Sequence, residues 1–92
     1  MKIKKVITVN LAVFISGRGT NLQSIIDSVQ QGIIPVDIKV VISSNPDAFG
    51  LKRAEEAGIK AVVVDPEDFT NEEEFEQKLL EILEQLKIDL VA

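Results

Sequence analysis

The chain has 92 residues, a formal net charge of −5 and a hydrophobic fraction of 46%. This length fits one small domain, the apolar fraction excludes an intrinsically disordered chain, and the acidic balance argues against nucleic-acid binding and a basic membrane-binding patch. The sequence has no cysteine and no histidine, which excludes disulfides, Cys-based zinc sites, thiolate nucleophiles and the commonest general base.

The first predicted element is a strand from Val6 to Ser16. Its continuous apolar run from Leu11 to Ile15 is typical of a parallel strand that is covered on both faces. The basic start of the chain is interpreted as a polar lead-in to this strand, because no signal-peptide cleavage pattern follows it. No apolar stretch has the length of a membrane helix, so we expect a cytoplasmic protein without a membrane partner.

A helix and a second strand are predicted next. Apolar residues from Leu22 to Val29 recur at intervals of three and four, which places them on one face of a helix. Gly32 suits the left-handed position that ends a helix, and Pro35 prevents the helix from continuing. The apolar stretch that follows predicts a strand over residues 37–43.

A short second helix is predicted over residues 48–57, because Gly58 follows it and small apolar residues form its inner face. The run of valines after this helix predicts a third strand over residues 61–64. Residues 65–68 contain a proline among acidic residues and are predicted to form a loop.

The last part of the chain predicts a long helix and a fourth strand. Thr70 and Glu73 have the spacing of a capping box that opens the helix, and residues 88–92 predict the strand. The order β-α-β-α-β-α-β predicts an α/β fold with a Rossmann-like parallel sheet. No linker or repeat divides residues 1–92, which we expect to form one Rossmann-like unit.

The stretch Gly17-Arg18-Gly19-Thr20-Asn21 lies between the first predicted strand and the first predicted helix. In doubly wound sheets, ligands bind beyond the carboxyl ends of the strands, where this loop is expected. The unpaired N–H groups and partial positive charge of a helix N-terminus favour an anion, and glycines let a ligand approach the backbone. We therefore predict a phosphate site, to which Thr20 and Asn21 add a hydroxyl and an amide.

Other interpretations of this loop are open. Gly17 and Gly19 could serve only to shape the turn, with Thr20 or Asn21 as a simple helix cap. A dinucleotide site is disfavoured, because Leu22 stands where the third glycine of that fingerprint belongs and no acidic residue ends the second strand. The loop is not a P-loop, because no Gly-Lys-Ser/Thr sequence follows it.

Two further residues are candidate supports of the phosphate site. Arg18 lies within the glycine loop, where it either assists the site or is solvated. Asn45 lies in the loop after the second strand, which should adjoin the glycine loop if the two strands are neighbours; turn formation and helix capping are the alternative. The acidic run from Glu72 to Glu76 lacks the spacing of a metal site, so no metal site is predicted.

These motifs resemble the N-terminal half of the phosphoribosylglycinamide formyltransferase family, also called glycinamide ribonucleotide transformylase. The stretch from Ser16 to Gln23 is similar to the family's opening Ser-Gly-x-Gly-Ser/Thr-Asn-Leu-Gln signature. The stretch from Ser44 to Ala54 has the form of a second family segment, apart from one position of shorter spacing around Pro46. The resemblance runs from Leu11 onward and implies an incomplete formyltransferase domain.

The resemblance implies a step of purine biosynthesis, the transfer of a formyl group from 10-formyltetrahydrofolate to the amine of glycinamide ribonucleotide. The resemblance implies that the substrate phosphate is bound by Gly19, Thr20 and Asn21. The chemistry of the loops adds three possible supporting residues: Gly17, Arg18 and Asn45. The family's catalytic Asn, His and Asp would lie beyond Ala92. We therefore assign no catalytic residue and expect this chain alone to be inactive and not to bind the folate tightly.

The fourth predicted strand lacks its crossover and would leave unpaired edge groups. We expect a second copy of the chain, or a missing C-terminal half, to complete it. The alternative function is a stand-alone Rossmann-like module that binds a phosphorylated metabolite without catalysis.

Overall fold

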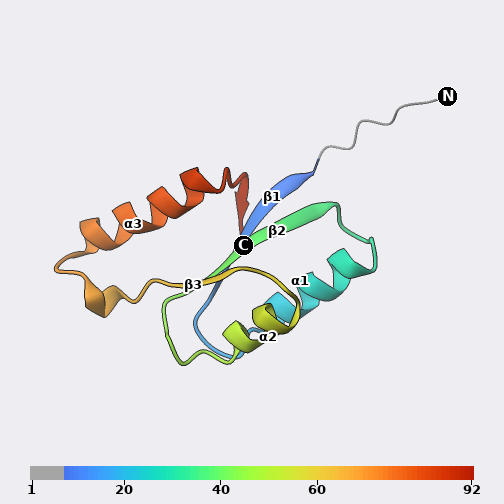
Figure 1. The fold of residues 1–92 in the computed structure, drawn as a ribbon, viewed down its shortest axis with the longest axis horizontal. Coiled ribbons are helices and arrows are strands. Elements are labelled where there is room, and N and C mark those ends of the chain that lie inside the picture. Colours follow the sequence, from blue (N-terminus) through green and yellow to red (C-terminus); the bar gives the residue numbers. More distant parts are fainter. Residues whose placement is uncertain (1–7) are drawn as a thin grey trace.

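Four parallel strands form the sheet of the computed structural model, which describes residues 8–92 (Figure 1). They lie side by side in the order β3-β2-β1-β4 and are β1 (Val9–Ile15), β2 (Val36–Ser43), β3 (Ala61–Val63) and β4 (Leu90–Val91). The predicted α/β class with a parallel sheet is confirmed. Val6 and Ile7, at the start of the first predicted strand, lie outside the described residues.

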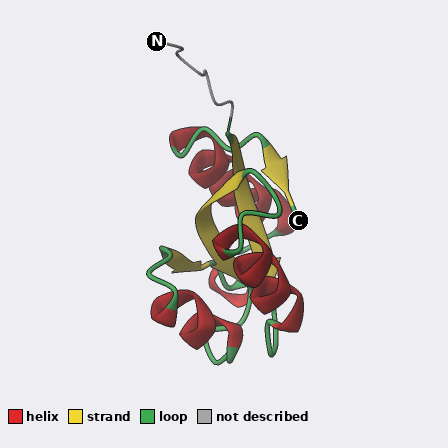
Figure 2. Ribbon diagram, turned by 90° about the vertical axis from the view of Figure 1, so that its right-hand side faces the viewer, coloured by secondary structure: helices red, strands yellow, loops and turns green. Residues whose placement is uncertain are grey.

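The helices cover both faces of this sheet (Figures 1 and 2). Helices α1 (Thr20–Gln30) and α2 (Gly50–Glu56) pack on one face, and α3 (Glu72–Gln85) packs on the other. The segment predicted as a loop between β3 and α3 contains one short 3-10 helix, η1 (Pro66–Asp68). It forms because the Asp65 carboxylate accepts the backbone N–H of Glu67 at 2.9 Å.

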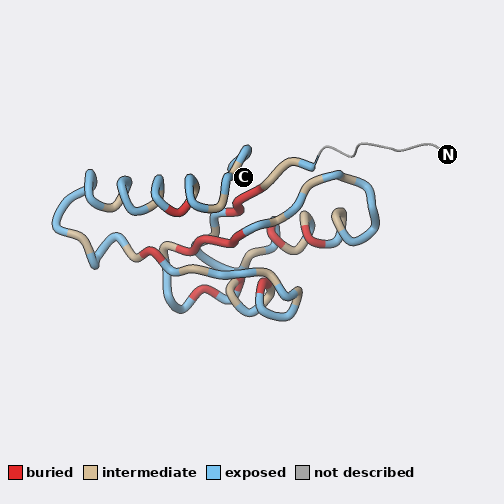
Figure 3. Tube along the Cα trace, turned by 45° about the horizontal axis from the view of Figure 1, so that its top comes forward, coloured by how far each residue is buried: buried red, intermediate tan, exposed pale blue. Residues whose placement is uncertain are grey.

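Alternate residues of the two central strands face opposite sides of the sheet and form two apolar cores. The core under α1 and α2 contains Leu11, Val13, Leu22, Ile26, Val41 and Ala54. The core under α3 contains Ala12, Val40, Ile42, Val64 and Ile82. Figure 3 shows the buried residues gathered along the central strands. The prediction that the first strand is covered on both faces is therefore confirmed, and the loop at its carboxyl end starts from a fixed strand.

Three helices of the described chain end in the same hydrogen-bonded motif. After α1, the N–H of Gly32 donates to the Val29 carbonyl at 3.0 Å, and the N–H of Ile33 donates to the Ser28 carbonyl at 2.9 Å. Gly32 and Gly58 take the left-handed conformation that this motif needs, with φ of 74° and 72°, as predicted. Lys87 occupies the same position after α3, with φ of 53°.

The start of α3 differs from the prediction by one residue. The cap is Asn71, whose side chain accepts the Glu74 N–H at 2.9 Å, while a Glu74 carboxylate oxygen accepts the Thr70 N–H at 3.1 Å. The predicted Thr70–Glu73 capping box is therefore wrong. Asparagine is a better cap than threonine, and this register also lets Phe75 meet Phe69 edge to face, with ring centroids 5.8 Å apart.

Two element boundaries also differ from the prediction. Helix α2 begins at Gly50 and not at residue 48, because the residues before it form turns with hydrogen bonds between residues i and i+3. The N–H of Ala48 donates to the Asn45 carbonyl, and the N–H of Leu51 donates to the Ala48 carbonyl. Strand β4 is shorter than the predicted 88–92, because Ile88 is still bonded to the end of α3 through the Leu83 carbonyl.

Candidate functional site

The candidate site lies where the chain reverses direction across the sheet. Strands β2 and β3 lie on one side of β1 and β4 lies on the other, so the carboxyl end of β1 is the switch point at which α/β sheets bind ligands. The loops after β1 and β2 meet here, as predicted for neighbouring strands. The Asn45 side-chain amide donates to the Ser16 carbonyl at 3.4 Å, and the Ser44 N–H donates to the Ile15 carbonyl at 3.2 Å.

Helix α1 begins at this point without a side-chain cap. Its N-cap is Gly19, in the left-handed conformation with φ of 73° and ψ of 33°. The interpretation in which Thr20 or Asn21 caps the helix is wrong, because these residues already belong to its first turn. Among residues 8–92, no acceptor pairs with the N–H of Thr20, Asn21 or Leu22, and the first turn contains no acidic residue. The positive end of the helix dipole is therefore free to meet an anion.

Three successive carbonyl groups, at Ser16, Gly17 and Arg18, are held by the segment that follows β2. The Ser16 carbonyl accepts from Asn45, and the Gly17 carbonyl accepts the Gly50 N–H at 3.0 Å. The Arg18 carbonyl accepts from Nε of Arg53 at 2.7 Å. Each of these bonds anchors one peptide unit of the loop on its α2 side.

The opposite edges of these peptide units are consequently free. The peptide bonds of the described chain are trans, and in a trans peptide the N–H points away from the carbonyl of the same unit. The N–H groups of Gly17, Arg18 and Gly19 thus point away from their anchored carbonyls, and none has an acceptor within residues 8–92. With the first turn of α1, the loop presents an unbroken run of unpaired N–H groups from Gly17 to Leu22.

A cavity of about 220 Å³ lies against this run and is lined by Phe14, Ile15, Ser16, Gly19, Thr20, Asn21 and Leu22. The structure thus brings together the three residues predicted as the phosphate site. Gly17 and Arg18 lie in the same loop but do not line the cavity. Asn45 lies in the loop after β2 and is not among the lining residues; its side-chain amide donates to the Ser16 carbonyl.

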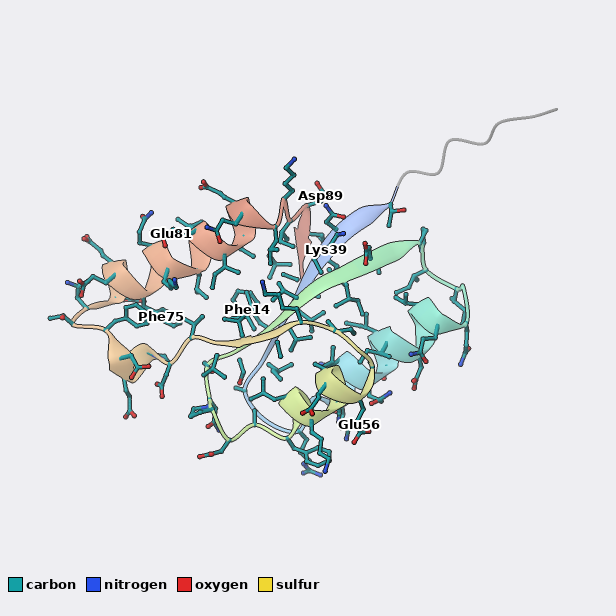
Figure 4. All side chains as sticks on the ribbon, viewed as in Figure 1. Phe14, Lys39, Glu56, Phe75, Glu81 and Asp89 are labelled. Carbon is teal, nitrogen blue, oxygen red and sulfur yellow. The ribbon has the colours of Figure 1, made fainter. Side chains whose placement is uncertain are left out.

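A second cavity adjoins the first on the α3 side of the sheet. It has a volume of about 260 Å³, and its lining is mainly apolar: Phe14, Ile15, Ser16, Ile42, Ser44, Val64, Phe75 and Leu79. The two cavities share the segment from Phe14 to Ser16. Figure 4 labels Phe14 on β1 and Phe75 on α3, and both residues line this second cavity. A ligand held at the glycine loop therefore has an apolar neighbour surface.

Sequence reasoning missed two residues of α2 that shape the loop. Gly50 donates to the Gly17 carbonyl and lies so close to the loop that a Cβ on it would come within 3.1 Å of the Gly19 Cα. Arg53 binds the Arg18 carbonyl and also donates to Oε1 of Gln23 at 3.2 Å. A signal was present, since Gly50 and Arg53 are three residues apart on one helix and therefore face the same way.

Other kinds of site find no support in the described chain. Across residues 8–92, no three His, Cys, Asp or Glu side chains gather closely enough to hold a metal ion. No helix within that range is both long enough and apolar enough to cross a membrane.

The chain is similar to known formyltransferases along nearly its whole length. A family model described as formyl transferase matches residues 9–92. Phosphoribosylglycinamide formyltransferase of Haemophilus influenzae is 44% identical over 82 residues, which are 89% of this chain and 39% of the relative. The trifunctional purine biosynthetic protein adenosine-3 of Drosophila melanogaster is 39% identical over 84 residues, which are 89% of this chain and 6% of that protein.

A solved structure has the same fold. Glycinamide ribonucleotide transformylase 1 from Geobacillus kaustophilus superposes with a TM-score of 0.90 at 34% identity, over 92% of this chain and 45% of that chain. The chain thus spans less than half the length of these relatives. The predicted family resemblance is confirmed, and because the family model matches all but one of the described residues, the chain belongs to the formyl transferase family.

Proposed function

We propose that this chain forms the substrate-phosphate-binding part of a phosphoribosylglycinamide formyltransferase. In that enzyme, a formyl group passes from 10-formyltetrahydrofolate to the amine of glycinamide ribonucleotide, a step of purine biosynthesis. The observation that carries the proposal is the run of N–H groups from Gly17 to Leu22 without an acceptor in residues 8–92, of which Gly19 to Leu22 line a cavity at the switch point of the sheet. The names of the relatives support the choice of substrate.

Each site residue has a distinct part in this proposal. The N–H groups of Gly19, Thr20 and Asn21 bind the phosphate oxygens at the positive end of α1, and the Thr20 hydroxyl and Asn21 amide add hydrogen bonds. Gly17 and Arg18 do not line the cavity and support the site through the loop that they form. The side chain of Asn45 holds the loop through the Ser16 carbonyl.

Catalysis in this proposal depends on groups outside these 92 residues. The substrate amine attacks the formyl carbon, and an oxyanion forms that needs hydrogen-bond donors and a proton acceptor. The sequence has no histidine, and the relatives are more than twice as long as the matched segment. We assign residues 1–92 to one ribonucleotide-binding part of a formyltransferase domain. A further polypeptide segment, or a second copy, completes the site in the cytoplasm, and the folate is a cosubstrate that this part alone does not hold tightly.

A titration followed by NMR tests the binding part of the proposal. We expect glycinamide ribonucleotide to shift the amide signals of Gly19, Thr20 and Asn21 more than those of α3. Ribose 5-phosphate and inorganic phosphate serve as controls, because a site that recognises only the phosphate group would bind them as well. Equal shifts with every phosphate compound would favour the stand-alone metabolite-binding module, and no shift at the loop would overturn the proposal.

A formyl-transfer assay tests whether the catalytic groups lie outside these 92 residues. We expect no turnover from these 92 residues with glycinamide ribonucleotide and 10-formyltetrahydrofolate, because the chain lacks the acid–base groups. Clear turnover by the purified chain would contradict the assignment of catalysis to groups outside it.

A further inference from the structure

We propose that Arg53 is a positioning residue for the phosphate site, which holds the glycine loop in the conformation that turns its N–H groups outward to the ligand. This inference rests on the proposed function, because it concerns the same site. It is carried by the contacts of the Arg53 guanidinium with the loop and with α1.

The guanidinium connects three parts of the chain. Its Nε donates to the Arg18 carbonyl at 2.7 Å, and its Nη1 donates to Oε1 of Gln23 at 3.2 Å. Gln23 in turn donates to the Asp27 carboxylate at 3.0 Å. The positive charge of the donor makes the bond to the Arg18 carbonyl short. The bond to Gln23 connects the same guanidinium to α1.

The bond to the Arg18 carbonyl decides which way one critical peptide unit faces. Because this peptide is trans, holding the carbonyl on the α2 side directs the Gly19 N–H to the opposite side. Gly19 has φ of 73° and no Cβ, so this peptide unit can rotate at little steric cost. Without an anchor the carbonyl oxygen is free to turn the other way, and its negative end would then oppose an anion.

Arg53 acts through the loop and not on the ligand. It is absent from the residues that line the cavity of about 220 Å³. Two of its three nitrogens are already bonded to protein oxygens, and the Phe49 ring stacks on the guanidinium, 5.2 Å from Cζ to the ring centroid. Lysine cannot reproduce this arrangement, because one ammonium group does not offer two donors in a planar fork.

The experiment compares Arg53→Met, Arg53→Lys and Lys52→Met in the full chain. Lys52→Met is the matched control, because it removes the same charge from the neighbouring, exposed position of α2. The probe is glycinamide ribonucleotide, and its affinity is read from the amide shifts of Thr20 and Asn21 in the folded protein. Hydrogen exchange of the Gly50 amide, which donates to the Gly17 carbonyl of the loop, is measured without ligand as a second readout.

We expect Arg53→Met to weaken binding about tenfold, as for loss of one charge-assisted hydrogen bond that orders the site, and Lys52→Met to change it less than about twofold. Arg53→Lys should regain only part of the loss. The Gly50 amide should exchange faster in Arg53→Met, because the loop that supplies its acceptor is held less firmly, while the amides of α3 stay protected. If Arg53→Met does not fold, Gln23→Met removes one of the two acceptors and should give a smaller change of the same kind.

Three outcomes overturn the inference. They are unchanged affinity in Arg53→Met, full recovery in Arg53→Lys, which would indicate charge alone, and unchanged exchange of the Gly50 amide in Arg53→Met. Failure of the unmodified chain to bind the ribonucleotide would refute the proposed function instead, and the exchange measurement would still decide whether Arg53 orders the loop.

Discussion

Gly19 and Gly50 contact each other directly through their backbones. A Cβ built on Gly19 would lie 2.7 Å from the Cα of Gly50, closer than real Cβ atoms come to other heavy atoms. Gly19 precedes α1 and Gly50 opens α2, so this contact brings the starts of two helices together at the carboxyl ends of β1 and β2. The glycine loop keeps its shape because both sides of this contact lack a side chain.

The first prediction is that Gly19→Ala destabilises the fold. The added Cβ meets backbone and not a flexible side chain, and an L residue with φ of 73° is strained whatever the space. Together these effects should cost roughly 2–4 kcal/mol of unfolding free energy. Gly17→Ala is the control, because nothing lies within 4 Å of the Cβ it adds. Urea unfolding of both variants measures the difference, and equal losses would contradict the steric account.

The second prediction concerns Asn21→Asp, which should change stability and binding in opposite directions. Asn21 is exposed in the first turn of α1, which contains no acidic residue. A carboxylate there should stabilise the fold by about 0.3–1 kcal/mol through the helix dipole. The same charge should repel a bound phosphate and weaken ribonucleotide binding. Thermal unfolding and the NMR titration measure the two effects, and tighter binding by the variant would rule out an anion at this helix end.

The third prediction is that Lys87→Gly stabilises the protein. Lys87 has φ of 53°, where glycine pays no steric penalty and other residues do. The substitution should raise the free energy of unfolding by about 1 kcal/mol through relief of this strain. The greater conformational freedom of glycine in the unfolded chain opposes part of that gain. The backbone carbonyl that accepts from Asn10 Nδ2 at 2.9 Å is kept. Gly58→Ala, at the equivalent end of α2 with φ of 72°, should lose stability by a similar amount.

The fourth prediction distinguishes the observed cap of α3 from the one that its sequence suggested. Asn71→Ala should destabilise the protein by about 1 kcal/mol, because it removes the acceptor of the Glu74 N–H. Thr70→Ala should cost much less, because Thr70 contributes its backbone N–H and not its hydroxyl. A larger loss in Thr70→Ala, measured by chemical denaturation, would restore the Thr70–Glu73 box.

Local patterns were sufficient to predict the elements around the site. The apolar run of β1 and the helical spacing from Leu22 onward are properties of neighbouring residues, so their strand and helix were predicted in the right order. Gly32 and Gly58 were placed correctly for the same reason, since a helix end in the left-handed conformation depends on one residue type. Where two adjacent residues can both cap a helix, as Thr70 and Asn71 can, local pattern does not choose between them, and the structure has Asn71 as the cap.

Local sequence patterns are enough to predict that a glycine loop joins a buried strand to a helix, because these features depend on residues close together in the chain. The direction in which the N–H groups of that loop point depends instead on contacts between distant segments. Arg53 is 35 residues from Arg18, and the two meet because β1 and β2 are neighbours in the sheet. The direction of the loop is therefore a property of two segments held side by side, which no pattern within either segment contains.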